Sequence, residues 1–408
     1  MKKTGPIPAH FARDGAELRI GGRAVSDLVA EAGDTPLFVY DRGAIDAKAA
    51  AFRAAFGTRV ALHYAMKANP YPPLLRHMIA ATEGIDVASA GEMRMALDAG
   101  ADAEHLSFAG PGKRDDDLAA ALTAGITLHC ESEGEAARTI AIAAGLDLRP
   151  RIAVRVNPDF EIKGSGMRMG GGAKPFGVDA VRVPALVRHL LDAGVDWRGF
   201  HIYSGSQTLD ATAIIGTQAQ TLALAGRLAD AVGETPPLVN LGGGFGIPYF
   251  AGDTPLDIDA VAEALSAEFN NLPQSLANTR FALEFGRWLV GEAGVYLTRI
   301  VDRKQSHGRT FLVTDGGLQH QLAASGNFGQ VIRRNFPVAI ASRWDGDPAE
   351  EATIVGCLCT PLDLLGDEIV VPRADVGDVV AVFVAGAYGL SASPQAFLGQ
   401  RGAIEMLV

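Results

Sequence analysis

The sequence predicts an α/β fold in which a (β/α)8 barrel is followed by a smaller β-domain. In the centre of the chain, short apolar runs alternate with amphipathic stretches rich in Ala and Leu. Such alternation indicates parallel strands that are connected by helices. From about residue 290 onward the helical spacing is lost and strand-like runs follow one another, which is typical of a separate β-domain.

The barrel prediction rests on the number of strand-like runs in the central region. The candidates are Val60–Tyr64, Ile85–Ala88, Leu106–Ala109, Ile126–Cys130, Arg151–Val156, Gly199–Tyr203, Leu238–Leu241 and Phe281–Phe285. The segments between them, such as 115–124 and 214–232, carry apolar residues at helical spacing. Eight strand–helix units are the number that closes such a barrel. A doubly wound open sheet is the alternative, because the period of a sequence does not show closure.

The two ends of the chain differ from this centre. The C-terminal strand candidates are Val295–Val301, Thr310–Thr314, Glu351–Val355, Val379–Val384 and Ala403–Val408. Near the N-terminus, Glu17–Gly22 and Leu37–Tyr40 are also strand-like. We therefore expect residues 1–38 to pair with the β-domain, residues 39–288 to form the barrel and residues 289–408 to form the β-domain.

Composition narrows the functional classes. A chain of 408 residues is long enough for two domains. Its net charge of -11 argues against a nucleic-acid partner, since phosphate binding needs a basic face. We expect no membrane partner, because no run approaches the roughly 18 apolar residues of a membrane span. The sparse cysteines and the lack of a secretory signal indicate the cytoplasm. A metal-dependent hydrolase is disfavoured, because the chain has no His-x-His motif.

Polar residues gather at the predicted strand ends, where barrels of this kind carry their active sites. They include Lys67, Asp86, Ser89, Arg155, His201, Tyr203, Ser206, Gln207, Glu284 and Arg287. Lys67 follows the first strand in the run His63-Tyr-Ala-Met-Lys-Ala-Asn-Pro70. A partly desolvated amine there has a lowered pKa and forms Schiff bases with carbonyls. A surface lysine is the alternative interpretation.

A glycine run follows the seventh predicted strand, in Leu241-Gly-Gly-Gly-Phe-Gly246. Glycines let backbone N–H groups approach an anion closely, and phosphate sites in these barrels often use the loops after strands seven and eight. The run matches neither a dinucleotide fingerprint nor a P-loop. With Ser206 on one side and Arg287 on the other, we expect a phosphate site at Gly243, Gly244, Phe245 and Gly246. A tight turn is the alternative.

A Schiff-base lysine, a phosphate site and a charged partner for a ring nitrogen together indicate pyridoxal 5′-phosphate (PLP). Glu284 is the candidate partner of the ring nitrogen. A carboxylate there favours the protonated ring, which is the stronger electron sink. An ion pair with Arg287 is the alternative role for Glu284.

The sequence resembles the fold type III PLP decarboxylases, a group with diaminopimelate, ornithine and arginine decarboxylases and, as a distant relative, alanine racemase. The similarity extends from about Leu37 to Val408. The motifs that carry it are Tyr64-Ala-Met-Lys-Ala-Asn69, Asp86-Val-Ala-Ser-Ala-Gly-Glu92, Arg155-Val-Asn-Pro158, Gly205-Ser-Gln207, Leu241–Gly246, Glu284–Arg287, Cys359 and Gly386-Ala-Tyr-Gly389. The resemblance implies an alanine-racemase-like barrel with a β-domain, and PLP-dependent α-decarboxylation.

The resemblance also implies roles for single residues. Lys67 would hold PLP as the internal aldimine, and Glu284 would pair with the pyridine nitrogen. Cys359 would come from the other subunit of a head-to-tail homodimer and protonate the carbon after CO2 leaves, whereas without the family it would be expected to be an inert buried thiol. The phosphate would be held by Ser206, the backbone of Gly243 to Gly246, Arg287 and Tyr388. The other residues near the cofactor would be Asp86, Arg155, His201, Tyr203 and Gly286.

Departures from the family concern the substrate. The family's stacking histidine is Tyr203 here, and its Glu-Pro-Gly-Arg motif contains Phe285. In diaminopimelate decarboxylases a glutamate follows the cysteine and binds the distal ammonium of the substrate. Here Thr360 follows, and the next carboxylate is Asp363. The Arg-Pro-x-Leu-Tyr motif for the distal carboxylate is absent.

The segment 323–337 lies in the region of that missing motif, and its Arg333 or Arg334 could meet an anionic group. A site without both contacts discriminates poorly for free diaminopimelate. We therefore expect a modified or carrier-tethered amino acid as substrate. The alternatives are a meso-diaminopimelate decarboxylase of lysine biosynthesis, a PLP-dependent racemase, and a non-enzymatic PLP carrier of a single barrel.

Overall fold

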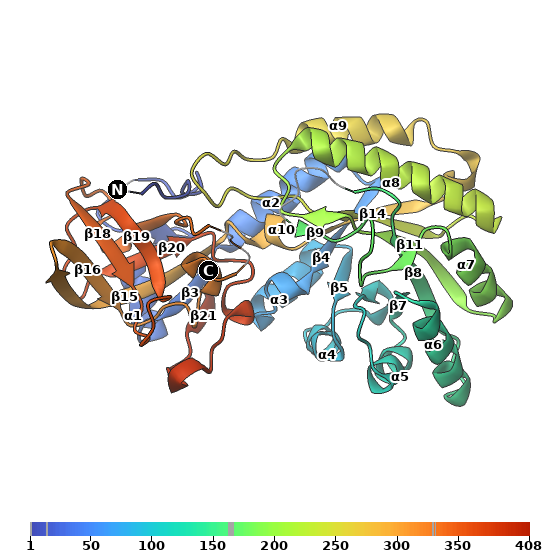
Figure 1. Ribbon diagram of the computed structural model, residues 1–408, viewed down its shortest axis with the longest axis horizontal. Helices are drawn as coiled ribbons and strands as arrows, with labels where there is room; N and C mark the ends of the chain where they lie inside the picture. Colours follow the sequence, from blue (N-terminus) through green and yellow to red (C-terminus); the bar gives the residue numbers. More distant parts are fainter. Residues whose placement is uncertain (1, 14, 162–166, 329, 331) are drawn as a thin grey trace. The chain divides into compact units, whose positions relative to one another are not determined.

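The computed structural model describes residues 2–13, 15–161, 167–328, 330 and 332–408. The chain forms two compact units, which Figure 1 shows in the colours of the sequence. One unit contains residues 49–246 and 255–286, and the other contains residues 1–48, 247–254 and 287–408. Each unit is built from segments that are distant in the sequence.

The first unit is a closed parallel barrel. Its strands are β4 (Val60–Ala65), β5 (Gly84–Val87), β6 (Leu106–Phe108), β7 (Thr127–Cys130), β8 (Arg151–Asn157), β11 (Asp196–Ile202), β13 (Leu238–Gly243) and β14 (Arg280–Phe285). Each strand pairs with the next, β7 pairs with β8, and β14 pairs with β4, so the ring has no open edge. The predicted (β/α)8 barrel is confirmed, and the open sheet is excluded.

Helices connect these strands and lie outside the ring (Figure 1). They are α2 (Arg42–Phe56), α3 (Pro72–Ala81), α4 (Ala90–Asp98), α5 (Asp115–Ala124), α6 (Glu133–Gly145), α7 (Val183–Asp192), α8 (Ala211–Val232) and α9 (Ile258–Phe269). Several of them begin at side-chain caps, and α5 and α8 end at the left-handed glycines Gly125 and Gly233. Ser89 and Ser132 accept the N–H groups of Glu92 and Glu135, which satisfies donors that a helix start leaves unpaired. Ser89 therefore caps α4.

Small elements complete the barrel unit. Strand β10 (Val178–Asp179) pairs with β8, and β9 (Met167–Arg168) pairs with β12 (Gly205–Ser206). The short helices are η1 (Met66–Ala68), η2 (Ala103–His105) and η3 (Gln274–Leu276). Among them η1 matters most for the site, because it follows directly on β4.

The second unit contains a mixed sheet with the order β17-β20-β15-β16-β18-β19, and β3 and β21 extend it beside β15. Its strands are β3 (Leu37–Tyr40), β15 (Gly294–Ser306), β16 (Arg309–Thr314), β17 (Val338–Ile340), β18 (Glu350–Val355), β19 (Leu364–Val371), β20 (Val379–Phe383) and β21 (Ile404–Leu407). Its helices are α1 (Val25–Ala32), α10 (Arg287–Val290), η4 (Leu322–Ser325), η5 (Ala341–Arg343), η6 (Leu390–Ala392) and η7 (Phe397–Gly399). Leu37 lies opposite Ile404, so the early strand β3 pairs with the last one.

One expectation for this sheet was wrong. The stretch Glu17–Gly22 does not join the sheet: β1 (Arg19–Ile20) pairs only with β2 (Arg23–Ala24). Gly21 and Gly22 have φ angles of 57° and 78°, and this left-handed conformation turns the chain back at once. Strand β19 was not predicted, because Gly366, Asp367 and Glu368 interrupt its apolar run. Within the described residues, the model contains no helix that combines the length and the hydropathy of a membrane span.

Candidate active site

A cavity of about 220 Å³ lies at the carboxyl ends of the barrel strands. It collects side chains from several different strands, as expected where parallel strands end at one edge of a barrel. The predicted residues that line it are Lys67, Asp86, Arg155, His201, Tyr203 and Glu284. The structure therefore brings the barrel part of the predicted site together.

Lys67 lies on η1, just beyond the end of β4. Its side chain lines the cavity, where it is exposed. Its amine is 5.9 Å from the centre of the Tyr203 ring. A Cβ atom at Gly286 would lie 2.7 Å from the Cβ of Ala68. The glycine thus lets the end of β14 pass close to the turn that carries the lysine.

Glu284 is one of two buried carboxylates that line the cavity, the other being Asp86, and 7% of its surface is exposed. Its Oε2 atom lies 3.3 Å from Nε2 of His201. Burial by itself raises the pKa of Glu284, but hydrogen bonding to His201 and the charge of Lys67 outweigh burial and lower it to about 2. Glu284 is therefore ionised at neutral pH.

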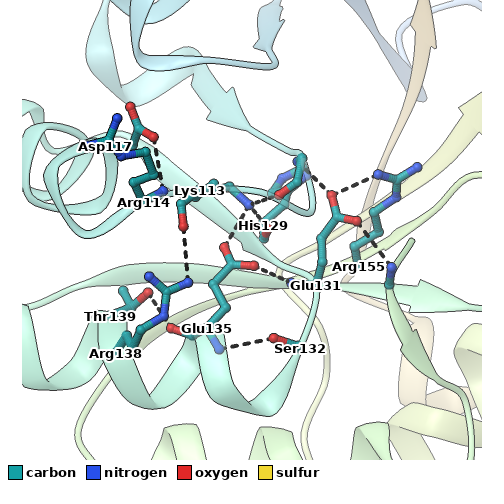
Figure 2. A network of polar contacts seen from close by, with 12 residues as sticks. Lys113, Arg114, Asp117, His129, Glu131, Ser132, Glu135, Arg138, Thr139 and Arg155 are labelled. Atoms are coloured by element: carbon teal, nitrogen blue, oxygen red, sulfur yellow. Dashed lines mark hydrogen bonds and ion pairs between the residues drawn. The ribbon is translucent and has the colours of Figure 1, made fainter. Parts of the chain in front are cut away.

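Arg155 is held by a carboxylate that the sequence analysis missed. Its guanidinium donates to Glu131 at 2.8 Å (Figure 2). Glu131 also accepts the N–H groups of Gly110 and Gly177, at 2.6 and 3.2 Å. One buried side chain thus joins three segments around the cavity. The available signal was its position directly after the predicted strand that ends at Cys130.

A second buried pair supports the same wall. The Lys113 amine donates to Glu135 at 2.7 Å, to the Gly110 carbonyl at 2.7 Å and to the His129 carbonyl at 2.9 Å (Figure 2). Lys113 is only 4% exposed. Because a buried ammonium is costly without partners, this arrangement fixes the loop after β6 relative to β7.

Asp86 makes polar contacts with other residues of the barrel. Its Oδ1 accepts from the Ser107 hydroxyl, and its Oδ2 lies 3.5 Å from Nδ1 of His63. Burial lowers the pKa of His63, but the nearby charge of Asp86 outweighs burial and raises it. Asp86 thus connects the cavity with the polar interior of the barrel.

The glycine run is required by close backbone packing. A Cβ at Gly243 would lie 1.9 Å from the Glu284 carbonyl oxygen, and one at Gly244 would lie 2.1 Å from that of Gly205. The N–H of Gly246 donates to the Thr208 carbonyl at 2.8 Å, so this N–H is already engaged. Close packing of the backbone therefore requires these glycines, and it also brings the run beside Ser206 on β12.

The Phe245 side chain belongs to the core. It is 2% exposed, and its ring centre lies 4.5 Å from that of Phe285 and 6.3 Å from that of Phe56. If Phe245 serves a ligand, only its backbone can do so. Its ring instead anchors the glycine run to α2 and β14.

Arg287 and Tyr388 lie together in the second unit. The guanidinium of Arg287 donates to the Tyr249 hydroxyl at 2.7 Å. Its carbon lies 5.3 Å from the ring centre of Tyr249 and 4.8 Å from that of Tyr388. Tyr249 was missed as a site candidate, although an isolated tyrosine shortly after the glycine run was a signal.

Asp363 has a structural role that corrects its proposed substrate contact. It is 2% exposed, and its two oxygens accept the N–H groups of Leu318 and Leu358 at 2.7 and 2.8 Å. A Cβ at Gly317 would lie 2.1 Å from this carboxylate. Burial raises the pKa of Asp363 and outweighs these hydrogen bonds. The side chain orders the loop instead of facing a ligand.

The same loop carries Cys359 and Thr360. Cys359 is exposed, so it is not the buried inert thiol that its residue type alone suggests. The Thr360 hydroxyl accepts the N–H of Leu362 at 3.3 Å. Thr360 thus shapes the turn that follows the cysteine.

The guanidinium of Arg333 is also engaged in hydrogen bonds within the protein. It donates to the Ser325 carbonyl at 3.1 Å, to the Asn335 side chain at 2.8 Å and to the Leu364 carbonyl at 3.3 Å. We therefore withdraw it as a substrate contact. Arg334 is exposed, with its guanidinium carbon 3.7 Å from the centre of the Phe250 ring. In the segment 323–337, residues 329 and 331 lie outside the described residues.

The barrel cavity fits PLP. It combines an accessible lysine amine, an aromatic ring beside that amine and a buried carboxylate that is held ionised. An alanine-racemase-like barrel with these groups at its strand ends defines the class of fold type III PLP enzymes.

A family comparison gives the more specific assignment. The model described as "Pyridoxal-dependent decarboxylase, pyridoxal binding domain" matches residues 42–291. The chain therefore belongs to the pyridoxal-dependent decarboxylases. It is a PLP-dependent carboxy-lyase, as the sequence analysis predicted.

Similar proteins support this assignment over nearly the whole chain. The L-glutamyl-[BtrI acyl-carrier protein] decarboxylase of Niallia circulans is 36% identical over 92% of this chain and 89% of that protein. The diaminopimelate decarboxylase of Methanothermobacter thermautotrophicus is 33% identical over 95% of this chain and 90% of that protein. The structure of diaminopimelate decarboxylase from M. jannaschii with L-lysine has a TM-score of 0.86 at 24% identity, covering 100% of this chain and 93% of that one. This structure confirms the fold.

Proposed function

We propose that the enzyme removes the α-carboxyl group of an amino acid whose far end is modified or attached to a carrier protein. The observation that carries this proposal is the inward orientation of Asp363. It is the one carboxylate in residues 357–363, and both of its oxygens are occupied by backbone N–H groups. The loop therefore offers no carboxylate for a distal ammonium. The relative that acts on carrier-bound glutamate gives independent support.

The residues of the cavity then have distinct roles. Lys67 would hold the cofactor through its amine, and Glu284 would pair with the ring nitrogen as an anion. When bound, PLP supplies an electron sink for the electron pair left by the departing carboxylate. Tyr203 would replace the stacking histidine of the family. The phosphate would be held by Ser206, Gly243, Gly244, Phe245, Arg287 and Tyr388. Gly246, whose N–H is bonded to Thr208, and Gly286 would give close approach, and Asp86, Arg155 and His201 would line the cavity.

We also propose a homodimer with shared sites. Cys359 of the partner subunit would donate the final proton to carbon, which agrees with the exposure of its thiol. A protonated thiol can act as a general acid. Residues 39–288 would form the cofactor-binding domain, while residues 1–38 would pair with the β-domain of residues 289–408.

A substrate screen tests the main proposal. Purified enzyme loaded with PLP would be given L-glutamyl-acyl carrier protein, free L-glutamate, L-ornithine and meso-diaminopimelate, and CO2 release would be measured. We expect kcat/KM for the carrier-bound substrate to exceed that for meso-diaminopimelate by about 10²-fold or more, since buried polar contacts set such preferences. Efficient turnover of meso-diaminopimelate without activity on the tethered substrate would refute the proposal.

The second candidate is a meso-diaminopimelate decarboxylase, which the 33% identity with the Methanothermobacter enzyme favours. If this candidate is correct, kcat/KM in the same screen should be higher for meso-diaminopimelate than for the carrier-bound substrate. A racemase is disfavoured, because a racemase typically places an arginine at the ring nitrogen, whereas the proposed partner of the ring nitrogen here is the anion Glu284. Loss of CO2 with deuterium incorporation at the α-carbon, and not inversion, distinguishes the two.

A further inference from the structure

Two buried histidines meet inside the barrel, next to the cavity. His129 on β7 and His201 on β11 come from strands on opposite sides of β8. Their Nδ1 atoms are 2.9 Å apart, and they are 4% and 3% exposed. Two ring nitrogens at this distance share one proton, because each neutral imidazole has one donor and one acceptor nitrogen.

The neighbour of His201 determines which ring donates. The other nitrogen of His201, Nε2, lies 3.3 Å from Oε2 of Glu284. An ionised carboxylate only accepts, so His201 carries its proton on Nε2 and accepts at Nδ1. His129 must then donate from Nδ1, which leaves its own Nε2 as an acceptor. His129 therefore donates a hydrogen bond to His201, and Nε2 of His201 faces the Glu284 carboxylate at 3.3 Å in an ion-pair contact that lacks hydrogen-bond geometry.

A second cavity lies at the far end of this chain of three groups. Its volume is about 380 Å³, and it is lined by His129 and His63, by the interior residues Ser107 and Asn240, and by Glu104 and Arg198 among others. Asn240 is 2% exposed, and its Nδ2 has no protein partner in the described structure. A roomy polar cavity with an unsatisfied buried donor is the kind of place that holds water. His201 and Glu284 line the first cavity and His129 lines the second, so the chain connects the two.

Several charged or titratable groups influence this chain. Burial lowers the pKa of His129 well below its usual value, and the neighbouring His201 and the charge of Lys113 lower it further. The groups concerned are His63 on β4, Asp86 on β5, Lys113 with its amine on the His129 carbonyl, Glu131 after β7, Arg155 on β8, Glu284 on β14 and Lys67 on η1.

We propose that His129 is a positioning residue that fixes the tautomer of His201 and admits protons from the second cavity toward Glu284. A proton from water binds Nε2 of His129, and the N–H bond at its Nδ1 breaks as an N–H bond forms at Nδ1 of His201. His201 is then an imidazolium beside the carboxylate and can pass its Nε2 proton to Glu284. One proton enters and one reaches the carboxylate, once the Nε2–H of His201 aligns with Oε2 of Glu284. The inference rests on the proposed pairing of Glu284 with the cofactor.

The first test reads the tautomers directly in the full-length chain without cofactor. Long-range ¹H–¹⁵N correlation spectra of ¹⁵N-histidine-labelled protein near neutral pH report which ring nitrogen is protonated. We expect His129 to carry its proton on Nδ1 and His201 on Nε2, with His129→Leu and His201→Gln variants assigning the signals. A proton on Nε2 of His129 would overturn the proposal, whatever the substrate screen shows.

The second test separates positioning from packing. His129→Asn keeps an N–H donor near the place of Nδ1, whereas His129→Leu has a similar size and no donor. In the PLP-loaded enzyme we expect His129→Leu to lower kcat about tenfold with little change in KM, and to shift the pH midpoint of the cofactor absorbance by about one unit. His129→Asn should stay within about twofold of wild type in kcat. Equal pH profiles for the two variants would contradict the relay. If the Leu variant does not fold, the tautomer spectra of the wild-type chain decide alone.

Discussion

Each of the two compact units contains a buried carboxylate that the sequence analysis proposed as functional: Glu284 at the end of a barrel strand and Asp363 in a loop. The surroundings of these two carboxylates differ. Glu284 in the barrel faces groups that carry or share positive charge, His201 and Lys67, and its pKa is lowered. Asp363 in the other unit faces only backbone N–H groups of Leu318 and Leu358, and burial raises its pKa. A carboxylate held by charges stays ionised and can act on a cofactor, whereas one held by backbone dipoles orders a loop. The groups that contact a buried carboxylate, more than its burial, thus determine whether it has a chemical or a structural role.

The largest effect is expected from substituting Lys67, whose charge helps to lower the pKa of Glu284. Lys67→Ala should lower kcat by about 10⁴-fold or more, as for loss of a covalent anchor. It should also abolish cofactor absorbance near ~420 nm, where PLP imines absorb. Steady-state kinetics and absorbance spectra check both. The matched control is Lys304→Ala, at an exposed lysine of β15, which should change neither. Retained absorbance in Lys67→Ala would place the cofactor elsewhere.

The next effect concerns the exposed thiol in the loop that Asp363 orders. Cys359→Ala should lower kcat by about 10²–10³-fold, as for a lost general acid. Mixing inactive Lys67→Ala with inactive Cys359→Ala subunits should restore part of the activity if the two residues come from different subunits. Analytical ultracentrifugation of the mixture verifies that dimers form. A mixture that forms mixed dimers and stays inactive would contradict the shared site.

Glu284→Gln keeps the size of the side chain and removes its charge. We expect kcat to fall about 10²-fold, because the ring nitrogen loses its anionic partner. The stability of the barrel should also depend on pH differently in this variant than in wild type. Since the folded pKa of Glu284 is about 2, below the unfolded value of about 4.3, its stabilisation is present above that unfolded value and is lost as the pH falls toward 2. Urea unfolding at several pH values should show this loss in wild type and its absence in Glu284→Gln.

Asp363→Asn is expected to have the smallest effect and the opposite pH dependence. Its raised folded pKa makes its contribution fully present below the unfolded value of about 3.9 and lost as the pH rises through the folded pKa. The amide nitrogen must also face a backbone donor, which costs about 1–3 kcal/mol. Thermal unfolding would measure this, with Asp302→Asn, at an exposed position of β15, as control. If the stability that Asp363 contributes were instead lost as the pH falls, as for Glu284, the proposed difference between the two carboxylates would be wrong.

The sequence predicted the barrel site well because of a geometric rule. Parallel strands end at one edge of a barrel, so polar residues after successive strands, such as Lys67 and Glu284, had to converge. The loops of the other unit follow no such rule. Asp363 and Arg333 looked available in the sequence, but each is used by backbone groups that are distant in the chain. Hydrogen bonds of this kind leave no periodic signal.

The sequence by itself determined the number of barrel strands, the positions of the strand-end residues and, through its motifs, the decarboxylase family. Only the tertiary structure decided that β14 closes on β4, that Glu131 holds Arg155, and that the histidines of β7 and β11 lie with their Nδ1 atoms 2.9 Å apart. The physical reason is the range of the interactions. Hydrophobic period and turn residues act over a few neighbours in the chain, whereas the pairing of buried polar groups is set by which side chains the closed barrel brings within hydrogen-bond distance.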